Sequence, residues 1–428
     1  MSSSRIPAFY KMSVTERRQR LAEVLALTPE EEAWLVGEQS LPLDVAEIMV
    51  ENAIGTFALP FGVGLNFQIN GRDYVVPMVV EEPSVIAAAS NAALVARAGG
   101  GFVAEADPGA MIGQIQLIRV PDPMAAVQRL RGARRHLLRR ADELTPGLCR
   151  RGAGPRDVEV RLVDTPRGET MVVVHVLLDT GDAMGANAVN SLVEALAPEV
   201  EEIAAGGEAC LRILSNLADR RLARSTVRVP VASLGRDGIA GEEVAERMVY
   251  AYELAWADPY RAATHNKGIM NGVDAVALAT GNDWRAIEAG AHAYACRDGA
   301  YRSLSTWCVE DGHLVGTLEL PLGVSTVGPT SETHPRVKLA FRMLSVETAG
   351  ELAAVMATVG LASNMAAMRA LATEGIQKGH MALHARAVSH AAGARGAEAE
   401  RLRHQLIEGG EIKIDRAREL LRSRAPRP

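Results

Sequence analysis

The sequence is poor in cysteine and in aromatic residues, and each shortage excludes a class of protein. Its four cysteines lie far apart and include no Cys-x-x-Cys pair. We therefore predict neither a disulfide framework nor a zinc site, which is typical of a reducing cytosol. Aromatic residues make up only 4% of the chain, which argues against stacking platforms for single-stranded nucleic acid. The formal net charge of −6 also disfavours nucleic acid, because such partners bind a basic surface.

Two nucleotide-binding motifs and a membrane-length apolar run are also missing. Without G-x-G-x-x-G there is no support for a Rossmann domain, and without G-x-x-x-x-G-K-[ST] there is no P-loop. Apolar runs such as 171–178, which His175 interrupts, are far too short to span a bilayer. Residues 1–7 lack the apolar stretch of a signal peptide. We therefore expect a soluble, cytoplasmic protein with no membrane partner.

Short-range signals predict several local structures. Ser13-Val-Thr-Glu16 has the spacing of a capping box at a helix start, and a further helix is expected over 43–54. Asn70-Gly71 lies between two strand-like runs and favours a type I′ hairpin turn. Ser84 is expected to cap the Ala-rich helix that follows it. With 48% hydrophobic residues over 428 positions, the chain is long enough for two or three domains.

The segment 110–216 has a pattern of its own. It predicts a strand, a long helix, two strands joined by a turn, a second helix and a last strand, in that order, at 111–120, 123–144, 157–163, 170–178, 187–205 and 209–214. This β-α-β-β-α-β order is the ferredoxin-like arrangement. We therefore expect a small domain inserted into a larger one.

The predicted fold class is α+β, in three parts. A large domain of mixed helices and strands is expected over 1–109 and 217–375, with the ferredoxin-like domain over 110–216. The last part, 376–428, is Ala-rich and helical, and glycines break it into pieces. Such breaks suit a hinged C-terminal flap, although ordinary helix ends have the same pattern.

Two adjacent carboxylates, Glu81 and Glu82, lie at a predicted strand-to-helix junction just before Ser84. Because side chains alternate along a strand, at most one of them points into a given pocket. A partly buried carboxyl group has a raised pKa and can donate a proton. The alternative is that both carboxylates are solvated and one favours the helix N-terminus.

A second candidate site is Asp182-Ala-Met-Gly-Ala-Asn187, which follows a predicted strand and opens a helix. Unpaired N–H groups and the helix dipole attract anions there, and Gly185 permits close approach of a phosphate. The pattern indicates a pyrophosphate site. The alternative is a simple N-cap by Asp182 or Asn187.

Polar residues with catalytic potential gather between 260 and 283. Lys267 can stabilise a developing oxyanion and Arg261 can pair with a carboxylate, unless the segment is an ordinary polar loop. Asp283 is expected near the start of another helix, as its cap or as an acidic neighbour of a lysine.

Further on, His380 and His384 have the spacing of half a metal site, but no third ligand follows. We expect no metal, and His380 is either structural or a general acid.

Taken together, seven segments resemble the 3-hydroxy-3-methylglutaryl-coenzyme A (HMG-CoA) reductase family. The similarity is closest to its soluble, bacterial-type class II, of the degradative, NAD-dependent type. The segments are Glu51–Phe57, Phe67–Asp73, Glu81–Ser90, Asp182–Asn187, Arg261–Gly272, Thr280–Ala286 and Gly379–Met381. By this resemblance the large domain would bind substrate and coenzyme A (CoA), and the ferredoxin-like domain the dinucleotide.

The resemblance also implies residue roles. Lys267 would stabilise the oxyanions of the thioester and of the hemithioacetal, and Glu82 would supply a proton at the aldehyde stage. Asp283 would lie between them and tune both through shared hydrogen bonds. His380, on the mobile flap, would protonate the departing CoA thiolate. The HMG or mevalonate end would be held by Ser84, Arg261 and Asn271, and the dinucleotide by Asp182, Met184, Gly185, Asn187 and Asn216.

The implied reaction interconverts HMG-CoA and mevalonate plus CoA, without a metal. It uses two successive hydride transfers, through mevaldyl-CoA hemithioacetal and mevaldehyde. NAD(H) is favoured by this resemblance. NADP(H) also fits, because the predicted helix 123–144 carries Arg134, Arg135, Arg139 and Arg140 beside Asp142 and Glu143, and arginine suits a 2′-phosphate whereas an acidic group suits NAD. The partners implied are HMG-CoA, mevalonate, CoA and a second copy of the chain. The active site would lie at the interface of this homodimer, which a higher oligomer would also contain.

Two departures from the family pattern stand out. The segment 323–334 is less glycine-rich than expected, and Ser363 stands where glutamine is expected.

Two other functions compete with the implied one. A non-catalytic ligand-binding relative is disfavoured because all four catalytic candidates are present. A reductase of another acyl-CoA would require Ser84 and Arg261 to recognise a different carboxylate.

Overall fold

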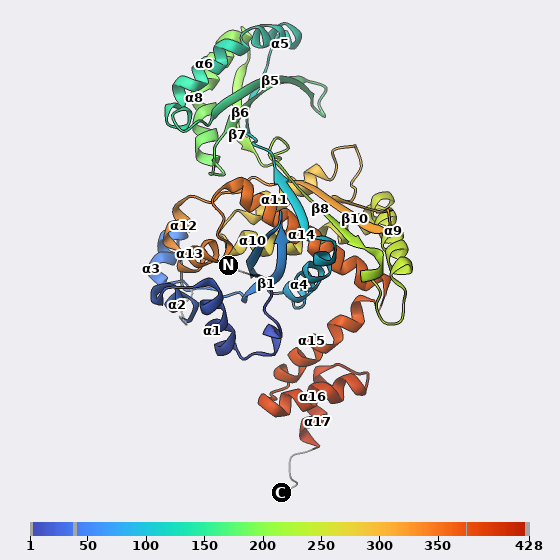
Figure 1. Cartoon of the computed structure of the whole chain (residues 1–428). Helices are drawn as coiled ribbons and strands as arrows, with labels where there is room; N and C mark the ends of the chain where they lie inside the picture. The colour runs from blue at the N-terminus through green and yellow to red at the C-terminus, as the bar shows by residue number, and fades with distance from the viewer. Residues whose placement is uncertain (1–2, 37–40, 374, 424–428) are drawn as a thin grey trace.

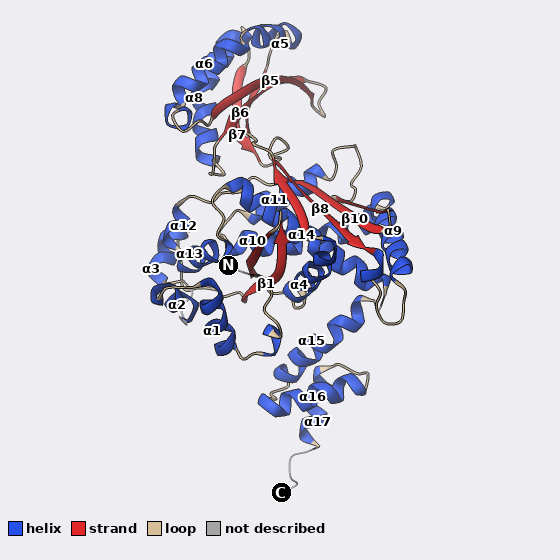
Figure 2. Ribbon diagram, viewed as in Figure 1, coloured by secondary structure: helices blue, strands red, loops and turns tan. Residues whose placement is uncertain are grey.

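The computed structural model describes residues 3–36, 41–373 and 375–423, without the side chains of 376–383. Figure 1 shows a central body of helices and strands, a smaller helix-and-sheet unit at one end, and three C-terminal helices at the other. The two sheets, red in Figure 2, belong to the central body and to the smaller unit.

The chain begins with a short 3-10 helix, Phe9–Lys11, and three α-helices: α1 (Val14–Leu25), α2 (Pro29–Val36) and α3 (Leu43–Met49). The predicted capping box is present at the start of α1. The Ser13 hydroxyl accepts from the Glu16 amide at 3.2 Å, and the Glu16 carboxylate accepts from the Ser13 amide at 2.6 Å. The prediction that α3 extends to residue 54 is wrong, because Val50 adopts an extended backbone (φ −144°, ψ 132°).

A six-stranded sheet forms the centre of the large body, with the order β2-β1-β3-β8-β10-β9. Its strands are β1 (Phe61–Ile69), β2 (Arg72–Val79), β3 (Phe102–Ala106), β8 (Leu222–Pro230), β9 (Ser305–Glu310) and β10 (His313–Pro321). Neighbours are antiparallel, except that β1 pairs with β3 in parallel. The predicted hairpin turn is confirmed, since Asn70 and Gly71 have φ values of 51° and 77°.

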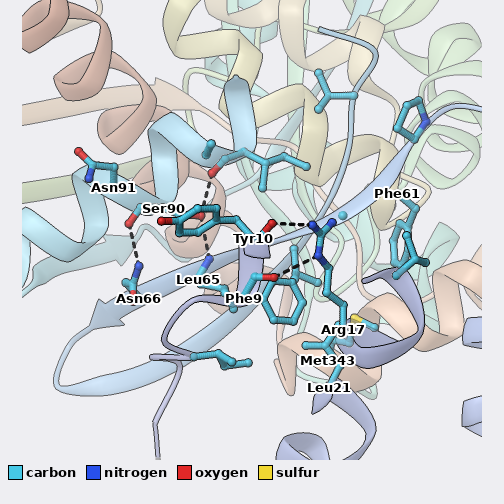
Figure 3. A pocket seen from close by; sticks show the side chains of 18 of the residues that line it. Phe9, Tyr10, Arg17, Leu21, Phe61, Leu65, Asn66, Ser90, Asn91 and Met343 are labelled. Carbon is cyan, nitrogen blue, oxygen red and sulfur yellow. Dashed lines mark hydrogen bonds between the residues drawn. The ribbon is translucent and has the colours of Figure 1, made fainter. Parts of the chain in front are cut away.

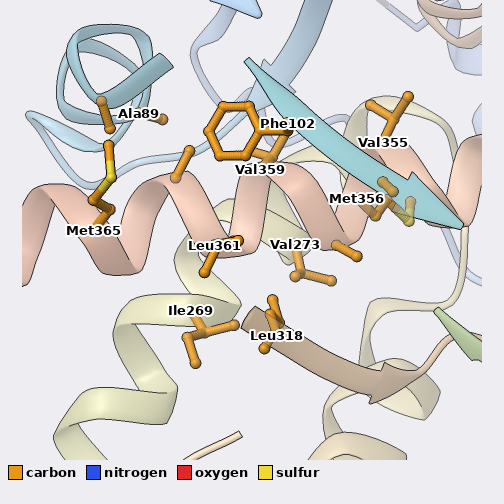
Figure 4. Close-up of a cluster of buried hydrophobic side chains, with 14 of the residues drawn as sticks. Ala89, Phe102, Ile269, Val273, Leu318, Val355, Met356, Val359, Leu361 and Met365 are labelled. Atoms are coloured by element: carbon orange, nitrogen blue, oxygen red, sulfur yellow. The ribbon is translucent and has the colours of Figure 1, made fainter. Parts of the chain in front are cut away.

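Four helices pack on this sheet and enclose the main core: α4 (Val85–Ala96), α9 (Gly241–Ala257), α10 (Pro259–Ala279) and α14 (Ala349–Ala372). Figure 4 shows Phe102 of β3, Val273 of α10 and Leu318 of β10 gathered around Met356 and Val359 of α14. Burial of these side chains is the main stabilising contribution, at about 25 cal/mol per Å² of apolar surface.

The central helix α14 also has the length and composition of a membrane span, which the sequence prediction did not note. It is the one such helix in the described part of the chain, and 78% of its most apolar window is buried inside the protein. Its contacts with α4, α9, α10 and the sheet account for its apolar surface. It is the core helix of the large body.

The smaller unit contains a four-stranded antiparallel sheet of order β5-β6-β4-β7. The strands are β4 (Met111–Ile118), β5 (Gly154–Asp164), β6 (Thr170–Asp179) and β7 (Glu208–Ser215), and α8 (Ala186–Ala204) packs against them. This order confirms the ferredoxin-like prediction. The single helix expected over 123–144 is instead α5 (Pro123–Gly132) and α6 (Arg134–Leu144), followed by α7 (Pro146–Cys149). The break comes at Ala133, whose ψ of 1° departs from the α-helical value.

The remaining helices frame the sheet edge and the C-terminus. They are α11 (Trp284–Tyr294), α12 (Pro329–Thr333), α13 (Pro335–Leu344), α15 (Ile376–Ala391), α16 (Gly396–Glu408) and α17 (Ile414–Arg422), with short 3-10 helices at Arg97–Gly99 and Val231–Ser233. The last three α-helices have a small core of their own that includes Ala385, Leu402 and Ala417. They extend away from the central body in Figure 1.

Candidate active site

A cavity of about 710 Å³ lies between α4, α10 and α14. It brings together five residues that the sequence singled out. Glu82 and Ser84 border it from the turn between β2 and α4, and Arg261, Lys267 and Asn271 border it from α10. We call it the acyl cavity. Its lining combines four cationic side chains (Arg236, Arg261, Lys267 and Arg369), one carboxylate and several hydrogen-bonding groups, which suits a polar, anionic ligand.

An ion pair joins two of these side chains. The Lys267 ammonium donates a hydrogen bond to the Glu82 carboxylate, across 185 positions of sequence. The side chains of Lys267 and Glu82 are 58% and 34% exposed, so the pair lies at the mouth of the cavity. Glu81 is exposed and does not line this cavity, but it lines the adjoining larger cavity together with Glu82. The prediction that only one of the two enters a given pocket is therefore wrong, because both follow the end of β2 and strand alternation does not apply to them. The arrangement presents an ammonium and a carboxyl group to the same ligand atom.

Ser84 does not cap α4, which corrects the sequence prediction. It occupies the N-cap position, but its backbone is left-handed (φ 79°, ψ −23°) and its side chain makes no capping bond. A capping residue needs an extended backbone to turn its oxygen toward the helix amides. Ser84 Oγ is buried without a hydrogen-bond partner among the described residues. Strained backbone of this kind concentrates at functional sites.

One stripe of α10 lines the acyl cavity. Asp258 caps the helix, with its carboxylate accepting from backbone amides of the first turn, and Pro259 follows at the first helical position. Positions 261, 264, 265, 268 and 271 follow helical spacing and all border the cavity. Burial lowers the pKa of Arg261, so a carboxylate ligand would compensate for the lost water around its charge.

The polar lining residues that were not among the predicted contacts include His265, Ser363 and Asn364. His265 follows Arg261 by four positions, so the helical period of the motif was a usable signal. Ser363 was noted only as a departure from the family pattern. Asn364 lies next to it on α14, and no sequence signal set it apart.

Asp283 lies elsewhere in the same chain. It is the N-cap of α11, where its carboxylate accepts from the Ala286 amide at 3.1 Å. Lys267 is twelve residues before the end of α10, which corresponds to about 18 Å at 1.5 Å per residue. Asp283 follows that end and does not line the acyl cavity. One chain therefore does not bring Asp283 to Lys267.

The loop between β6 and α8 forms a second candidate site. Gly185 occupies the N-cap of α8 with φ 84°, and no side chain caps the helix. The alternative cap by Asp182 or Asn187 is therefore wrong, because the Asp182 carboxylate instead accepts from the Ala349 amide of α14 at 2.8 Å. The uncapped first turn leaves its amides for an anion. Met184 is half-buried against the core of the smaller unit, and Asn187 is exposed.

Buried Arg221 holds this loop against the large body. Its guanidinium donates to the carbonyl oxygens of Ala183 at 3.0 Å and Gly181 at 3.2 Å, and to that of Val324 at 3.0 Å. The next residue, Ser325, donates through its hydroxyl to the Asp182 carbonyl at 3.1 Å. The loop therefore has a fixed position relative to segment 324–326.

The same segment also positions Asp283. Ser325 exchanges two hydrogen bonds with the Asn282 side chain, at 2.7 and 3.1 Å. Asn216 is exposed after β7, and its carbonyl oxygen lies against Gly290 of α11, within 2.5 Å of where a side chain would begin. The α8 loop, Asn216 and Asp283 thus form one junction, separate from the acyl cavity.

A larger cavity of about 1010 Å³ adjoins the acyl cavity. Figure 3 shows Phe9, Tyr10, Arg17 and Phe61 around it, with Arg17 donating to the carbonyl oxygens of the first two. Glu82, Pro83, Ser84, Ala87 and Asn91 border both cavities. Burial and the neighbouring Arg18 lower the pKa of Arg336 in its wall. The clustered positive charge and apolar walls suit an elongated anionic ligand.

Asp274 of α10 and Glu288 of α11 form a half-buried carboxyl pair. Burial, the charge of Glu288 and a hydrogen bond to it raise the pKa of Asp274 to about 8. The folded protein therefore holds this proton more tightly than the unfolded chain, whose aspartate pKa is near 3.8. The free energy of unfolding should fall as pH rises from about 4 to about 8 through this group.

Asp274→Asn is expected to remove this pH dependence, because the amide stays neutral and still donates to Glu288. The variant should be more stable than the wild type at pH 9 by roughly 1–3 kcal/mol, and similar to it at pH 4. Urea denaturation at several pH values measures the difference. Parallel curves for the two proteins would contradict a proton on Asp274.

The predicted residue His380 belongs to α15, but its side chain lies outside the described residues. Within the described part, no group of three or more His, Cys, Asp or Glu side chains is placed to hold a metal ion.

Comparisons with known proteins cover nearly the whole chain. The family model for hydroxymethylglutaryl-coenzyme A reductase matches residues 13–385. The 3-hydroxy-3-methylglutaryl-coenzyme A reductase of Archaeoglobus fulgidus is 51% identical over 420 residues, 98% of this chain and 94% of that protein. A probable enzyme of the same name from Borreliella burgdorferi is 33% identical over 389 residues, 89% of this chain and 86% of that protein.

Solved structures agree with the sequence matches. The Streptococcus pneumoniae HMG-CoA reductase is 41% identical, with a TM-score of 0.84 over 97% of this chain and 99% of that chain. A structure of the class II enzyme from the same organism, bound to NADPH, has a TM-score of 0.82 over 96% of this chain and 99% of that chain. The predicted α+β fold class is confirmed by this likeness. The chain belongs to the hydroxymethylglutaryl-coenzyme A reductase family, in its soluble, bacterial-type class II.

Proposed function

We propose that this chain interconverts HMG-CoA and mevalonate plus CoA by two successive hydride transfers, through mevaldyl-CoA hemithioacetal and mevaldehyde. The observation that carries the proposal is the Glu82–Lys267 ion pair on a cavity that Ser84, Arg261 and Asn271 also line. Arg261 offers a guanidinium to the carboxylate of the acyl group, and Lys267 an ammonium to its reacting oxygen. An acyl thioester with a carboxylate at one end and a reacting carbonyl at the other matches these two cations.

Different residues of the chain stabilise the oxyanion and donate the two protons. A bound nicotinamide supplies a hydride in each of the two reductions. Lys267 stabilises the negative oxygen that develops on the thioester carbon and on the hemithioacetal. When the carbon–sulfur bond breaks, His380 protonates the CoA thiolate, and Glu82 donates a proton to the alkoxide formed from mevaldehyde. The reduction thus takes up two hydrides and two protons and releases one thiol. Gly375, directly before α15, lines the acyl cavity, which supports a flap that brings His380 to it.

Each chain contributes two half-sites to a homodimer. Glu82 and Lys267 belong to the acyl cavity, whereas Asp283 and the α8 loop belong to the separate junction around Ser325. A complete site then combines the acyl cavity of one protomer with Asp283 of the partner subunit. Asp283 of the partner subunit would lie between Lys267 and Glu82 and tune both.

An exposed apolar surface supports this assembly. Ile54 is 100% exposed and Phe57 92%, and Ile48 is also exposed beside them in sequence. Such side chains cost free energy in water, so a cluster of them marks an interface. We propose that a second copy of the chain covers the segment 48–57 and that the homodimer is the minimum unit, alone or within a larger oligomer.

The α8 loop is the proposed dinucleotide site, together with Asp182, Met184, Asn187 and Asn216. The uncapped amides of α8 would bind the pyrophosphate. Asp182 supports the loop through its bond to Ala349 and would contact the cofactor through its backbone. The loop requires glycine at position 185, because its φ is 84° and an added side chain would overlap Thr180.

Gly185→Ala is expected to raise the KM for the nicotinamide cofactor by roughly tenfold or more, because it forces strain and overlap into this loop. The KM for mevalonate should stay the same. Gly181→Ala is the matched control, since Gly181 also has positive φ but its added side chain would lie 3.9 Å from Ala153, an ordinary contact. Equal effects of the two substitutions would contradict a special role for Gly185.

We propose NAD(H) as the preferred cofactor. The Asp142 carboxylate, near the end of α6, lies 3.7 Å from Cys149 Sγ. Ala153, four residues after Cys149, lies beside Gly181 of the α8 loop. These two contacts link Asp142 to the proposed dinucleotide site. An acidic side chain near the ribose accepts from the 2′-hydroxyl of NAD and repels the 2′-phosphate of NADP. Two arginines of this helix are already paired, Arg134 with Asp157 and Arg140 with Glu143. Because the S. pneumoniae relative is known with NADPH, both cofactors need testing.

Asp142→Asn is expected to lower the ratio of kcat/KM for NAD over NADP by about tenfold, through loss of that repulsion. Steady-state kinetics with both cofactors measures the ratio. Glu194→Gln, an exposed carboxylate on α8 of the same unit, is the matched control. A ratio that stays at the wild-type value in both variants would place the ribose elsewhere.

The cavity shown in Figure 3 is the proposed path for CoA. It shares Glu82 and Ser84 with the acyl cavity, so a thioester can pass from one into the other. Arg5, Arg17 and Arg18 border it and would attract the CoA phosphates.

The three parts of the chain then have separate tasks, in the cytoplasm of the cell. Residues 1–109 and 217–375 would form the large domain that binds substrate and CoA. Residues 110–216 would form the dinucleotide-binding domain, and 376–428 the flap that carries His380.

An absorbance assay tests the proposed function. Wild-type protein is mixed with mevalonate, CoA and NAD, and separately with NADP, and the nicotinamide band is followed. We expect reduction of the cofactor that requires mevalonate and CoA together. A folded dimer that reduces neither cofactor would overturn the proposal.

A further inference from the structure

We infer that His265 binds substrate: its Nδ1–H group donates a second hydrogen bond to the acyl carboxylate that Arg261 holds. The inference deepens the proposed function and rests on it. His265 lines the acyl cavity and is 2% exposed. It follows Arg261 by four positions on α10, so the two side chains are neighbours on one helical face, with Cβ atoms about 5–6 Å apart.

The hydrogen-bond network behind His265 determines which ring nitrogen carries the proton. Trp307 Nε1, which can only donate, lies 2.8 Å from Asn364 Oδ1. This contact orients the Asn364 amide, so its Nδ2 faces His265 Nε2 at 3.0 Å. An amide nitrogen can only donate, so Nε2 is the acceptor and the ring hydrogen is on Nδ1. Ser305 Oγ lies 2.7 Å from Nε2 and 2.9 Å from Asn364 Oδ1, and Nε2 stays an acceptor whichever of the two receives the Ser305 hydrogen, because the Asn364 amide nitrogen already donates to the ring.

The opposite side of the ring has no protein partner. His265 Nδ1 is buried without a hydrogen bond among the described residues. An unsatisfied buried donor destabilises a fold by about 1–3 kcal/mol, so such groups are rare unless a ligand satisfies them. Burial, followed by the charge of Arg261, lowers the pKa of His265 to about 3. The ring is therefore a neutral donor throughout the physiological range.

Two other unsatisfied groups border the same cavity. Ser84 Oγ and Ser363 Oγ are also buried without partners among the described residues. Ser84 comes from the turn before α4, Ser363 from α14 and His265 from α10, so three separate segments bring hydroxyl or imidazole groups without partners to the lining of one cavity. Such convergence indicates a ligand rich in oxygen acceptors. Because Arg261 lies on the same stripe of α10 as His265, we assign the carboxylate of the acyl group, rather than its thioester end, to this histidine.

Two substitutions separate the two ring nitrogens. His265→Gln keeps an acceptor near the Nε2 position for Asn364 but loses the Nδ1–H donor. His265→Asn keeps a donor near the Nδ1 position but leaves the Asn364 amide unpaired. We expect His265→Gln to weaken mevalonate binding by about 10–100-fold, as loss of a hydrogen bond to a charged group does. Its melting temperature and its KM for the nicotinamide cofactor should match the wild type. His265→Asn should melt at a lower temperature but bind mevalonate within a few-fold of the wild type.

Calorimetry with mevalonate measures these affinities, and the cyclic ester of mevalonate, which lacks the free carboxylate, serves as the control ligand. The ester should bind the wild type and His265→Gln equally. Wild-type affinity for mevalonate in His265→Gln, or an equal loss of affinity and stability in both variants, would overturn the inference. A wild-type dimer that binds mevalonate through His265 but shows no turnover would count against the proposed reaction alone.

Discussion

Lys267→Ala should lose at least about 10²–10³-fold in kcat for the mevalonate-, CoA- and NAD-dependent reaction, while the protein stays folded. Reduction of a thioester places negative charge on oxygen, and one fixed donor to such an oxygen contributes a factor of this size. The Lys267 ammonium is the cation that contacts Glu82 at the cavity mouth. Because an interaction of the transition state is lost, kcat should fall more than the KM for mevalonate rises.

The stability of this variant should be nearly unchanged. The Lys267–Glu82 pair is about half exposed, and exposed ion pairs contribute only about 0–1 kcal/mol. Lys413→Ala is the matched control, since Lys413 forms an exposed pair with Glu411 at 3.0 Å in the connection between α16 and α17. It removes the same charge and should keep wild-type kcat. Lys267→Ala with more than a tenth of wild-type kcat would remove the oxyanion role from Lys267.

A mixed dimer of Lys267→Ala and Asp283→Ala chains should have about half the activity of the wild-type dimer, although each variant alone is nearly inactive. The expectation follows from the positions of the two residues: Lys267 lies about 18 Å before the end of α10 by helical rise, and Asp283 follows that end as the N-cap of α11. If a site combines Lys267 of one protomer with Asp283 of the partner subunit, the mixed dimer contains one intact site of two. Co-expression with two different tags, followed by purification on both, isolates this species.

A second mixed dimer gives the opposite result and serves as the control. Wild-type chain is paired with a chain that carries both substitutions, Lys267→Ala and Asp283→Ala. Sites shared between subunits leave this dimer nearly inactive, whereas sites within one chain leave it half active. Activity in the second mixed dimer and none in the first would contradict the half-site arrangement and assign Asp283 to its own chain.

Local signals in the sequence predicted local structure well. The capping box of Ser13 and Glu16 and the turn at Asn70 and Gly71 involve residues within three positions of each other. Their energetics depend on backbone geometry over one turn, which the sequence specifies directly. The ferredoxin-like order of 110–216 was predicted for a related reason, since alternation and helical periodicity report which face of each element is buried.

Other local predictions were wrong where tertiary packing competes with local preference. Ser84 has the identity of a helix cap, but its backbone is left-handed and its hydroxyl makes no capping bond, and the residue borders both cavities instead. Asp182 has the same capping preference, yet its carboxylate accepts from Ala349, 167 positions away. A capping bond contributes about 1 kcal/mol, which an alternative contact in the folded core can offset.

The sequence by itself therefore determined the fold class, the ferredoxin-like insertion and, through the family motifs, the residues to examine. Only the tertiary structure decided which of them meet. Glu82 contacts Lys267 because β2 and α10 pack side by side, while Asp283 is held at the junction around Ser325. Likewise, the tautomer of His265 depends on Trp307 and Asn364, which lie on β9 and α14. Periodicity and turn chemistry act over a few residues, whereas these contacts join distant segments that only the folded core brings together.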